Sequence, residues 1–184
     1  MPLELSFKLT DRDLQFFRDA LQRCRTVVEN ADENEVLDAI RDVISEIRQN
    51  EPLPDFVAHR LPEMESMIQM VRDEEWRLPQ EDREHVLSAF VYFGDPEDIL
   101  PDDVPVIGYL DDVIILELVA LELKHAIEAY TEFCEFREQY DHDHAEKSDA
   151  AVRRDRLDRQ RQQLHMRMQR RAANDRKNGL RQGL

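Results

Sequence analysis

The chain of 184 residues contains little cysteine and glycine and has no long uninterrupted apolar run. Its two cysteines, Cys24 and Cys134, have no CxxC or other ligand spacing, which argues against a disulfide framework and indicates a reduced compartment. Only four glycines are present, as suits a helical protein. The longest apolar stretch, residues 104–123, is interrupted by carboxylates, so we expect no transmembrane helix; these are Asp111, Asp112, Glu117 and Glu122.

Charge is distributed unevenly along the chain, although the net charge is −16. Residues 151–184 carry 11 basic and 3 acidic side chains, a net charge of +8. The remaining 14 basic and 38 acidic side chains give residues 1–150 a net charge of −24. A polyanionic partner would therefore meet the tail. The N-terminal residues lack the basic and apolar regions of a secretory signal, so we expect a cytoplasmic protein.

Apolar residues recur at three- and four-residue steps through most of the chain, which predicts an all-α fold. Helices are expected over about 10–30 and 32–50, each with a capping residue at its start, and after Pro62 and Pro79. The most apolar helix should begin at Asp111 or Asp112, continue to about residue 134 and lie at the centre of the fold.

From about residue 141 onward the apolar periodicity weakens. Leu157, Leu164 and Met168 remain within an Arg/Gln-rich stretch, enough for a solvated helix and too few for a core. We therefore expect one acidic domain of about five helices over residues 1–140. A basic helical or disordered extension should follow over residues 141–184.

A segment of 17 residues, 96–112, combines three prolines and one glycine with six carboxylates. Proline lacks a backbone donor and restricts the residue before it, so this segment predicts a rigid loop that leads into the central helix. Its spacing resembles the motif of the YkvA-like family, a bacterial domain of unknown function. The residues that carry the resemblance are Pro96, Asp98, Pro101, Asp102, Pro105, Gly108, Asp111 and Asp112.

The resemblance centres on residues 92–135 and extends with lower specificity over about residues 5–138. It implies a soluble relative with an acidic helical N-terminal part. It implies no reaction, because the family has no established activity.

The carboxylates of the motif allow several roles. Asp98, Asp102, Asp111 and Asp112 are candidate oxygen ligands for a divalent cation such as calcium or magnesium. Against this, the spacing is not that of the twelve-residue helix-loop-helix calcium loop. The favoured interpretation is structural, with these residues capping helices or bonding backbone donors; a partner-binding loop is a further alternative.

Catalysis would require a nucleophile, a phosphate-binding loop or an electrophile beside the carboxylates, and the sequence offers none. We therefore favour a non-enzymatic protein, name no catalytic residue and expect no cofactor, with a divalent cation as the exception to be tested.

The tail provides a second candidate site, for polyanions, at Arg153, Arg154, Arg170 and Arg171. Aromatic stacking residues and a recognition module are missing, so sequence-specific nucleic-acid binding is not expected. Weak contact with anionic lipid or RNA is an alternative to a tail that folds back on the acidic body or on a second copy.

Together these features predict an interaction or scaffold protein with an unidentified protein partner or a homo-oligomeric state. The alternative is a cation-binding or membrane-peripheral module at the inner membrane, which would use the Asp-rich loop and the basic tail.

Overall fold

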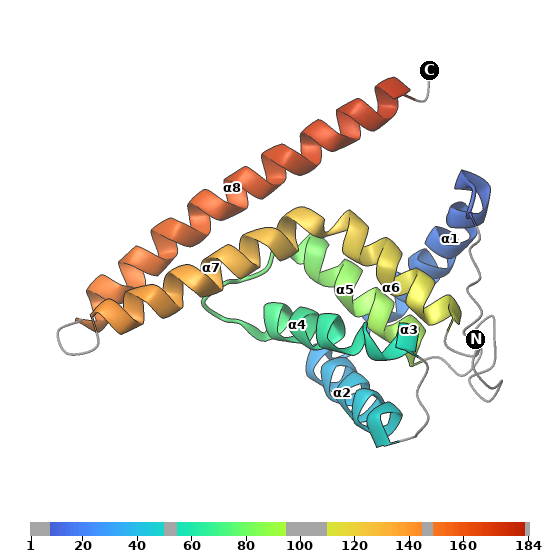
Figure 1. The fold of residues 1–184 in the computed structure, drawn as a ribbon, viewed down its shortest axis with the longest axis horizontal. Coiled ribbons are helices and arrows are strands. Elements are labelled where there is room, and N and C mark those ends of the chain that lie inside the picture. The colour runs from blue at the N-terminus through green and yellow to red at the C-terminus, as the bar shows by residue number, and fades with distance from the viewer. Residues whose placement is uncertain (1–7, 50–54, 95–109, 145–148, 183–184) are drawn as a thin grey trace, which may run out of the picture. The chain divides into compact units, whose positions relative to one another are not determined.

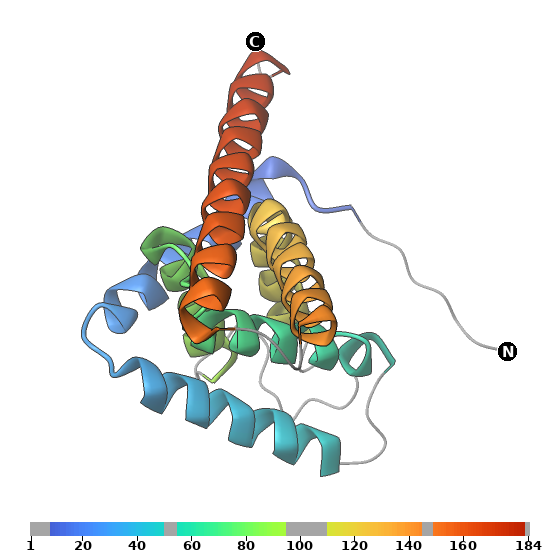
Figure 2. The same cartoon turned by 90° about the vertical axis from the view of Figure 1, so that its left-hand side faces the viewer.

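The computed structural model describes residues 8–49, 55–94, 110–144 and 149–182. Their regular structure is entirely helical, which confirms the predicted all-α class (Figures 1 and 2). No described helix has a stretch both long and apolar enough to cross a bilayer. The helices are α1 (Asp11–Val28), α2 (Glu33–Gln49), α3 (Asp55–Ala58), α4 (Leu61–Arg72), α5 (Gln80–Phe93), α6 (Leu110–Glu122), α7 (Lys124–Asp143) and α8 (Ala150–Gln182).

The chain forms two compact units. Unit 1 comprises Met1–Met64 and Glu84–Val119, and unit 2 comprises Glu65–Arg83 and Ala120–Leu184. The boundary expected from composition, between residues 140 and 141, falls inside α7. A division into domains that fold independently at that point stays a prediction.

The first two helices of unit 1 begin at the predicted caps. Thr10 and Asp13 form a reciprocal capping box, in which the Thr10 N–H donates to Asp13 Oδ2 at 2.8 Å. Asp32 Oδ1 accepts from the N–H groups of Asn34 and Glu35 at 2.8 and 3.2 Å. These side chains satisfy backbone donors that have no partner inside a helix.

The predicted central helix is interrupted in the structure. α6 ends at Glu122 and α7 begins at Lys124, with Leu123 between them at φ −94° and ψ 8°. Leu123 is buried, and its carbonyl accepts from the N–H groups of Ala126 and Ile127 at 2.8 and 3.0 Å. Neither proline nor glycine marks this break, so the apolar periodicity runs through it without a signal.

In unit 2, α7 and α8 pack side by side as an antiparallel hairpin (Figures 1 and 2). Leu157, Leu164 and Met168 of α8 are buried, with exposed fractions of 2%, 2% and 4%. The expectation that these residues are too few to join a core was therefore wrong. The reason is that α7 and the segment before α5 supply the rest of the apolar surface, including Trp76, Tyr130 and Phe133.

Candidate functional site

The two aspartates at the end of segment 96–112 lie in the first turn of α6, within unit 1. Asp111 and Asp112 have exposed fractions of 2% and 1%. The Tyr92 hydroxyl, from α5, donates to Asp111 Oδ2 at 3.1 Å. The positive end of a helix stabilises carboxylates in its first turn. Burial and a tyrosine partner are what a structural role for Asp111 requires.

The other motif residues lie outside the described residues; they are Pro96, Asp98, Pro101, Asp102, Pro105 and Gly108. The described part of the chain contains no group of three or more His, Cys, Asp or Glu side chains that could hold a metal ion. Asp111 and Asp112 are the members of the predicted cation set that fall within it. A cation site in the complete motif stays a prediction.

Unit 2 contains a second group of acidic residues, at the turn that follows α4. Asp73 Oδ1 accepts from the N–H groups of Glu75 and Trp76 at 2.9 and 3.0 Å. The Arg77 N–H donates to the Asp73 carbonyl at 2.9 Å, and Arg77 has a left-handed φ of 53°. An aspartate that bonds the backbone two and three residues ahead stabilises such a tight turn. We call the segment Asp73–Leu78 the Trp76 clasp.

Trp76, which this turn projects inward, is fully buried at 0% exposure. Its ring centroid lies 5.3 Å from that of Phe133 and 5.7 Å from that of Tyr130, both on α7. On the α8 side, the ring of His165 packs edge-on at 4.4 Å. One side chain therefore packs against both helices of the hairpin, and aromatic pairs at these separations are favourable beyond their buried area.

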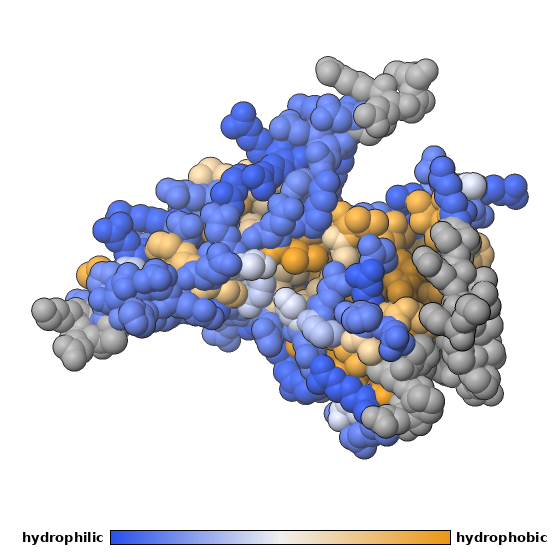
Figure 3. Space-filling view, in the orientation of Figure 1, coloured by the Kyte–Doolittle hydropathy of each residue, from blue (hydrophilic) through white to orange (hydrophobic). Residues whose placement is uncertain are grey.

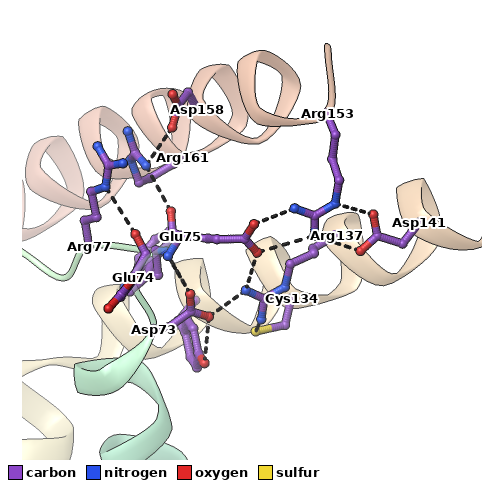
Figure 4. Close-up of polar contacts among 12 residues, drawn as sticks. Asp73, Glu74, Glu75, Arg77, Cys134, Arg137, Asp141, Arg153, Asp158 and Arg161 are labelled. Atoms are coloured by element: carbon purple, nitrogen blue, oxygen red, sulfur yellow. Dashed lines mark hydrogen bonds and ion pairs between the residues drawn. The ribbon is translucent and has the colours of Figure 1, made fainter. Parts of the chain in front are cut away.

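Ion pairs also join the clasp to α7 and α8 (Figure 4). Arg137 of α7 donates to Asp73 at 2.8 Å and to Glu75 at 3.1 Å. Arg153 of α8 pairs with Glu75 and also with Asp141 of α7, the latter at 2.6 and 2.9 Å. Glu75 thus joins an arginine from each helix, and guanidinium forks suit such multiple pairing.

A third arginine, Arg161, binds the clasp at the backbone carbonyl of Glu75. Arg161 of α8, only 8% exposed, donates to the carbonyl of Glu75 at 3.0 Å and pairs with Asp158 at 2.8 Å. Figure 4 shows that Arg161 and Arg153 reach the clasp from the same helix, two turns apart. The clasp therefore has both polar and apolar anchors on α8.

The charges of the clasp suit a structural network better than a reacting one. The hydrogen bond from Arg153 lowers the pKa of Glu75, and the same arginine lowers the pKa of Asp141. Burial raises the pKa of the Cys134 thiol, which sits 3.6 Å from Arg137. General acid catalysis needs a protonated carboxyl, and nucleophilic catalysis by cysteine needs a thiolate. These groups are shifted the opposite way.

The arginines of α8 divide between two sides of the helix. Arg153 and Arg171, two members of the predicted polyanion set, lie toward α7 and pair with Glu75 and Glu128. Arg167 pairs with Glu132 in the same manner. These three arginines neutralise acidic residues of their own unit.

The opposite side of α8 carries an exposed row that we call the outer seam. Its members alternate at four- and three-residue steps, and every one is exposed: Val152, Arg156, Arg159, Gln163, Met166, Arg170, Ala173 and Lys177. Arg159 pairs with Asp155 on the same helix at 2.8 Å, whereas Arg156, Arg170 and Lys177 form no ion pair with another described residue. The surface of α8 that is visible in Figure 3 is mostly hydrophilic, with a few apolar patches.

Arg154, the remaining member of the predicted polyanion set, is exposed one heptad before Arg161, outside the outer seam, and likewise has no ion pair within the described part of the chain. Of the four predicted arginines, the structure thus gives two to the hairpin and leaves two, Arg154 and Arg170, exposed.

Sequence reasoning missed the clasp. Glu75 lies 62 and 78 positions from its arginine partners Arg137 and Arg153. The one available signal was the chain's single tryptophan directly after three acidic residues. Sequence alone does not say which of the 25 basic residues pair with these three acidic residues.

Comparison with known protein families gives a match in the middle of the chain. Residues 85–118 match the model of a family described as "Protein of unknown function (DUF1232)". The match covers most of α5, the segment before α6, and the buried Asp111 and Asp112, all within unit 1. No curated protein and no solved structure matches the chain. The match supports a domain family without known function, while the narrower YkvA-like resemblance stays a prediction.

Proposed function

We propose that this protein is a non-enzymatic interaction protein, in which the α7–α8 hairpin presents the outer seam of α8 to an acidic helical partner protein. The observation that carries this proposal is the division of basic side chains on α8. One side is occupied by the unit's own carboxylates and the other side is exposed and basic.

The inner contacts give α8 a defined orientation. Leu157, Arg161, Leu164 and Met168 are buried at heptad spacing, and Arg161 is tied to the clasp. A helix held along one side in this way presents its opposite side as a fixed surface, so a partner does not have to order it on binding.

The outer seam has the spacing of a coiled-coil contact. Its four- and three-residue steps average 3.5 residues, the repeat at which one helix follows another. From Val152 to Lys177 it extends for about 37 Å at 1.5 Å per residue. Basic residues at these positions call for acidic residues at the facing positions of the partner, because charges across such contacts determine partner choice.

Two other polyanions fit this surface less well. The exposed apolar side chains of the seam, Val152 at 52% and Met166 at 64%, are two among polar neighbours, which is too little apolar surface for a helix lying in a bilayer. The seam contains no aromatic residue on which a nucleic-acid base could stack. Both remain outcomes of the test.

The test uses a designed acidic helix of about four heptads. Binding of a fluorescent peptide with glutamates along one seam is measured by anisotropy, beside a peptide of identical composition whose glutamates are scattered around the helix. We expect the seam peptide to bind more tightly and its affinity to fall between about 50 and 300 mM salt.

Arg156→Glu/Arg170→Glu should weaken binding at least about tenfold. The matched control is Arg12→Glu/Arg23→Glu on exposed positions of α1, which changes the net charge equally and should have little effect. Equal losses in the two variants, equal binding of the two peptides, or binding only to anionic vesicles or RNA would each refute the proposal.

A further inference from the structure

A second exposed row of side chains, on α2, carries the charge opposite to that of the outer seam. Its members follow one another at three- and four-residue steps, and every one is exposed: Glu35, Asp38, Asp42, Ser45 and Gln49. We call this the α2 row. The other side of α2 is buried in unit 1 through Leu37, Ile40, Ile44 and Ile47. The α2 row therefore points away from the core of its unit, as the outer seam does on α8.

The acidic members of the α2 row lie in an exposed environment. Glu35 and Asp42 form no ion pair with another described residue. Asp38 pairs with Arg41 of the same helix at 3.7 Å, and both of these side chains are more than half exposed. Exposed pairs of this kind contribute little to stability and exchange readily with other partners.

The α2 row and the outer seam have the same repeat. The steps of the row recur in the seam between Arg156 and Arg170. Two helices aligned in parallel then place Glu35 opposite Arg156, and one step further they place Asp38 opposite Arg159. The row extends for about 21 Å at 1.5 Å per residue, which is shorter than the seam. Opposite charges at facing positions favour this pairing, whereas two seams facing each other would repel.

The charges of the two units favour the same pairing. Unit 1, which contains α2, has 8 basic and 23 acidic side chains, a net charge of −15. Unit 2, which contains α8, has 17 basic and 18 acidic side chains, a net charge of −1. The field of unit 1 therefore attracts the basic seam of another copy, and the remainder of unit 2 adds little repulsion.

The exposed row of α7, which also contains acidic residues, fits the seam less well. Glu128 in that row already pairs with Arg171 of its own hairpin. Lys124 in the same row adds a positive charge that would face the arginines of the seam. The α2 row contains no basic residue.

We infer that the partner of the outer seam is a second copy of this chain, which offers its α2 row. This inference rests on the proposed function and names the partner that the seam binds. Each copy has one seam and one row, so two copies can exchange them and make the contact twice. Because both surfaces are mostly polar, we expect weak association, with a Kd of about 10–100 µM.

Sedimentation equilibrium of the full chain tests the inference. At a protein concentration of about 200 µM and about 50 mM salt, we expect at least twice the mass of one chain. At about 1 M salt the mass should return to that of one chain, because the contact depends on exposed charges.

Two charge-reversal variants test which surfaces meet. Arg156→Glu/Arg170→Glu makes the seam acidic, and Glu35→Arg/Asp42→Arg makes the α2 row basic. Each variant alone should have the mass of one chain, because its two surfaces then carry like charges. Mixed in equal amounts, the two variants should associate, since the acidic surfaces of one copy face the basic surfaces of the other.

The matched control is Asp19→Arg/Glu29→Arg, at exposed positions of α1, which changes the net charge as much as the reversal on α2. It should associate like the wild type. Circular dichroism confirms that each variant is folded.

A wild type with the mass of one chain that still binds the acidic seam peptide would overturn this inference and leave the proposed function standing. Failure of peptide binding as well would overturn both. Association that persists in either reversal alone, or a mixture that stays at the mass of one chain, would show that the seam and the α2 row do not meet between copies.

Discussion

The two sides of α8 use the same kind of residue for opposite purposes. On the inner side, Arg153 and Arg161 join the clasp, where packed aromatic rings exclude water around Trp76. On the outer side, Arg156 and Arg170 are exposed. Partly buried charge networks cost more to disrupt than isolated exposed charges, which contribute little to stability. The comparison teaches that a count of arginines in the tail cannot identify a binding surface until each has been assigned a side.

Trp76→Ala would disrupt the inner side most strongly. Removal of a fully buried tryptophan costs about 3–5 kcal/mol of folding free energy, and here the contacts with both α7 and α8 are lost together. Urea denaturation followed by circular dichroism measures the loss. Met166→Ala on the outer side is the control, for which we expect a change below about 0.5 kcal/mol. A similar, small cost for both substitutions would show that the clasp does not hold the hairpin.

Glu75→Gln should have an intermediate effect. It removes the charge that joins Arg137 to Arg153 and leaves both arginines partly compensated by Asp73 and Asp141. Because the Glu75 side chain is 41% exposed, we expect a loss of about 0.5–1.5 kcal/mol. Fluorescence of Trp76, the single tryptophan of the chain, reports the opening of the clasp during denaturation.

Arg137→Met, which keeps the length of the stem, should act on the same network. A double-mutant cycle with Glu75→Gln measures their coupling, and additive losses would contradict the shared network.

Low pH should lower the stability of the packing on the inner side of α8. Burial, together with the charge of Arg161, lowers the pKa of His165 below its ordinary value of 6.5. The unfolded chain then binds a proton more readily than the folded one, so stability is complete above pH 6.5 and falls as the pH drops through the folded pKa. Glu75 and Asp141, with lowered pKa values, add a further loss below pH 4.5 and pH 3.8.

His165→Phe preserves an aromatic contact with Trp76 and removes the titrating group. Denaturation midpoints should therefore depend less on pH between about 6.5 and 5 in this variant than in the wild type. An identical pH dependence in both proteins would exclude His165 as the source.

Arg156→Glu/Arg170→Glu should change stability least, by less than about 0.5 kcal/mol. Its expected effect is on partner binding, whereas the inner-side variants should change stability. A large loss of stability in this variant would mean that the outer seam takes part in folding and is not a free surface.

Periodicity predicted the helical class, and Thr10 and Asp32 correctly marked the first two helix starts. It failed at Leu123, where a buried leucine interrupts the helix without proline or glycine. It also underestimated α8, because the core of unit 2 includes residues distant in the chain, Trp76, Tyr130 and Phe133. The exposed positions of Arg154 and Arg170 were foreseeable as basic. That Arg153 and Arg171 instead pair with carboxylates of the same unit could be known only from the residues that pack against the helix.

Asp111 and Asp112 were correctly placed at the start of an apolar helix, and the structure adds their burial and the hydrogen bond between Tyr92 and Asp111. That contact joins α5 to α6 across 19 positions of sequence, so spacing alone gave no indication of it.

The most direct measurement of the two-sided account is cysteine labelling on α8, in a background with Cys24→Ala and Cys134→Ala. Met166→Cys places a thiol on the outer seam, and Leu164→Cys places one on the inner side. We predict that the outer thiol reacts at the rate of an unfolded chain and the inner thiol about 100-fold more slowly. Addition of the acidic seam peptide should then slow the outer thiol alone. Equal rates at the two positions, or an outer thiol that the bound peptide leaves unprotected, would contradict the account.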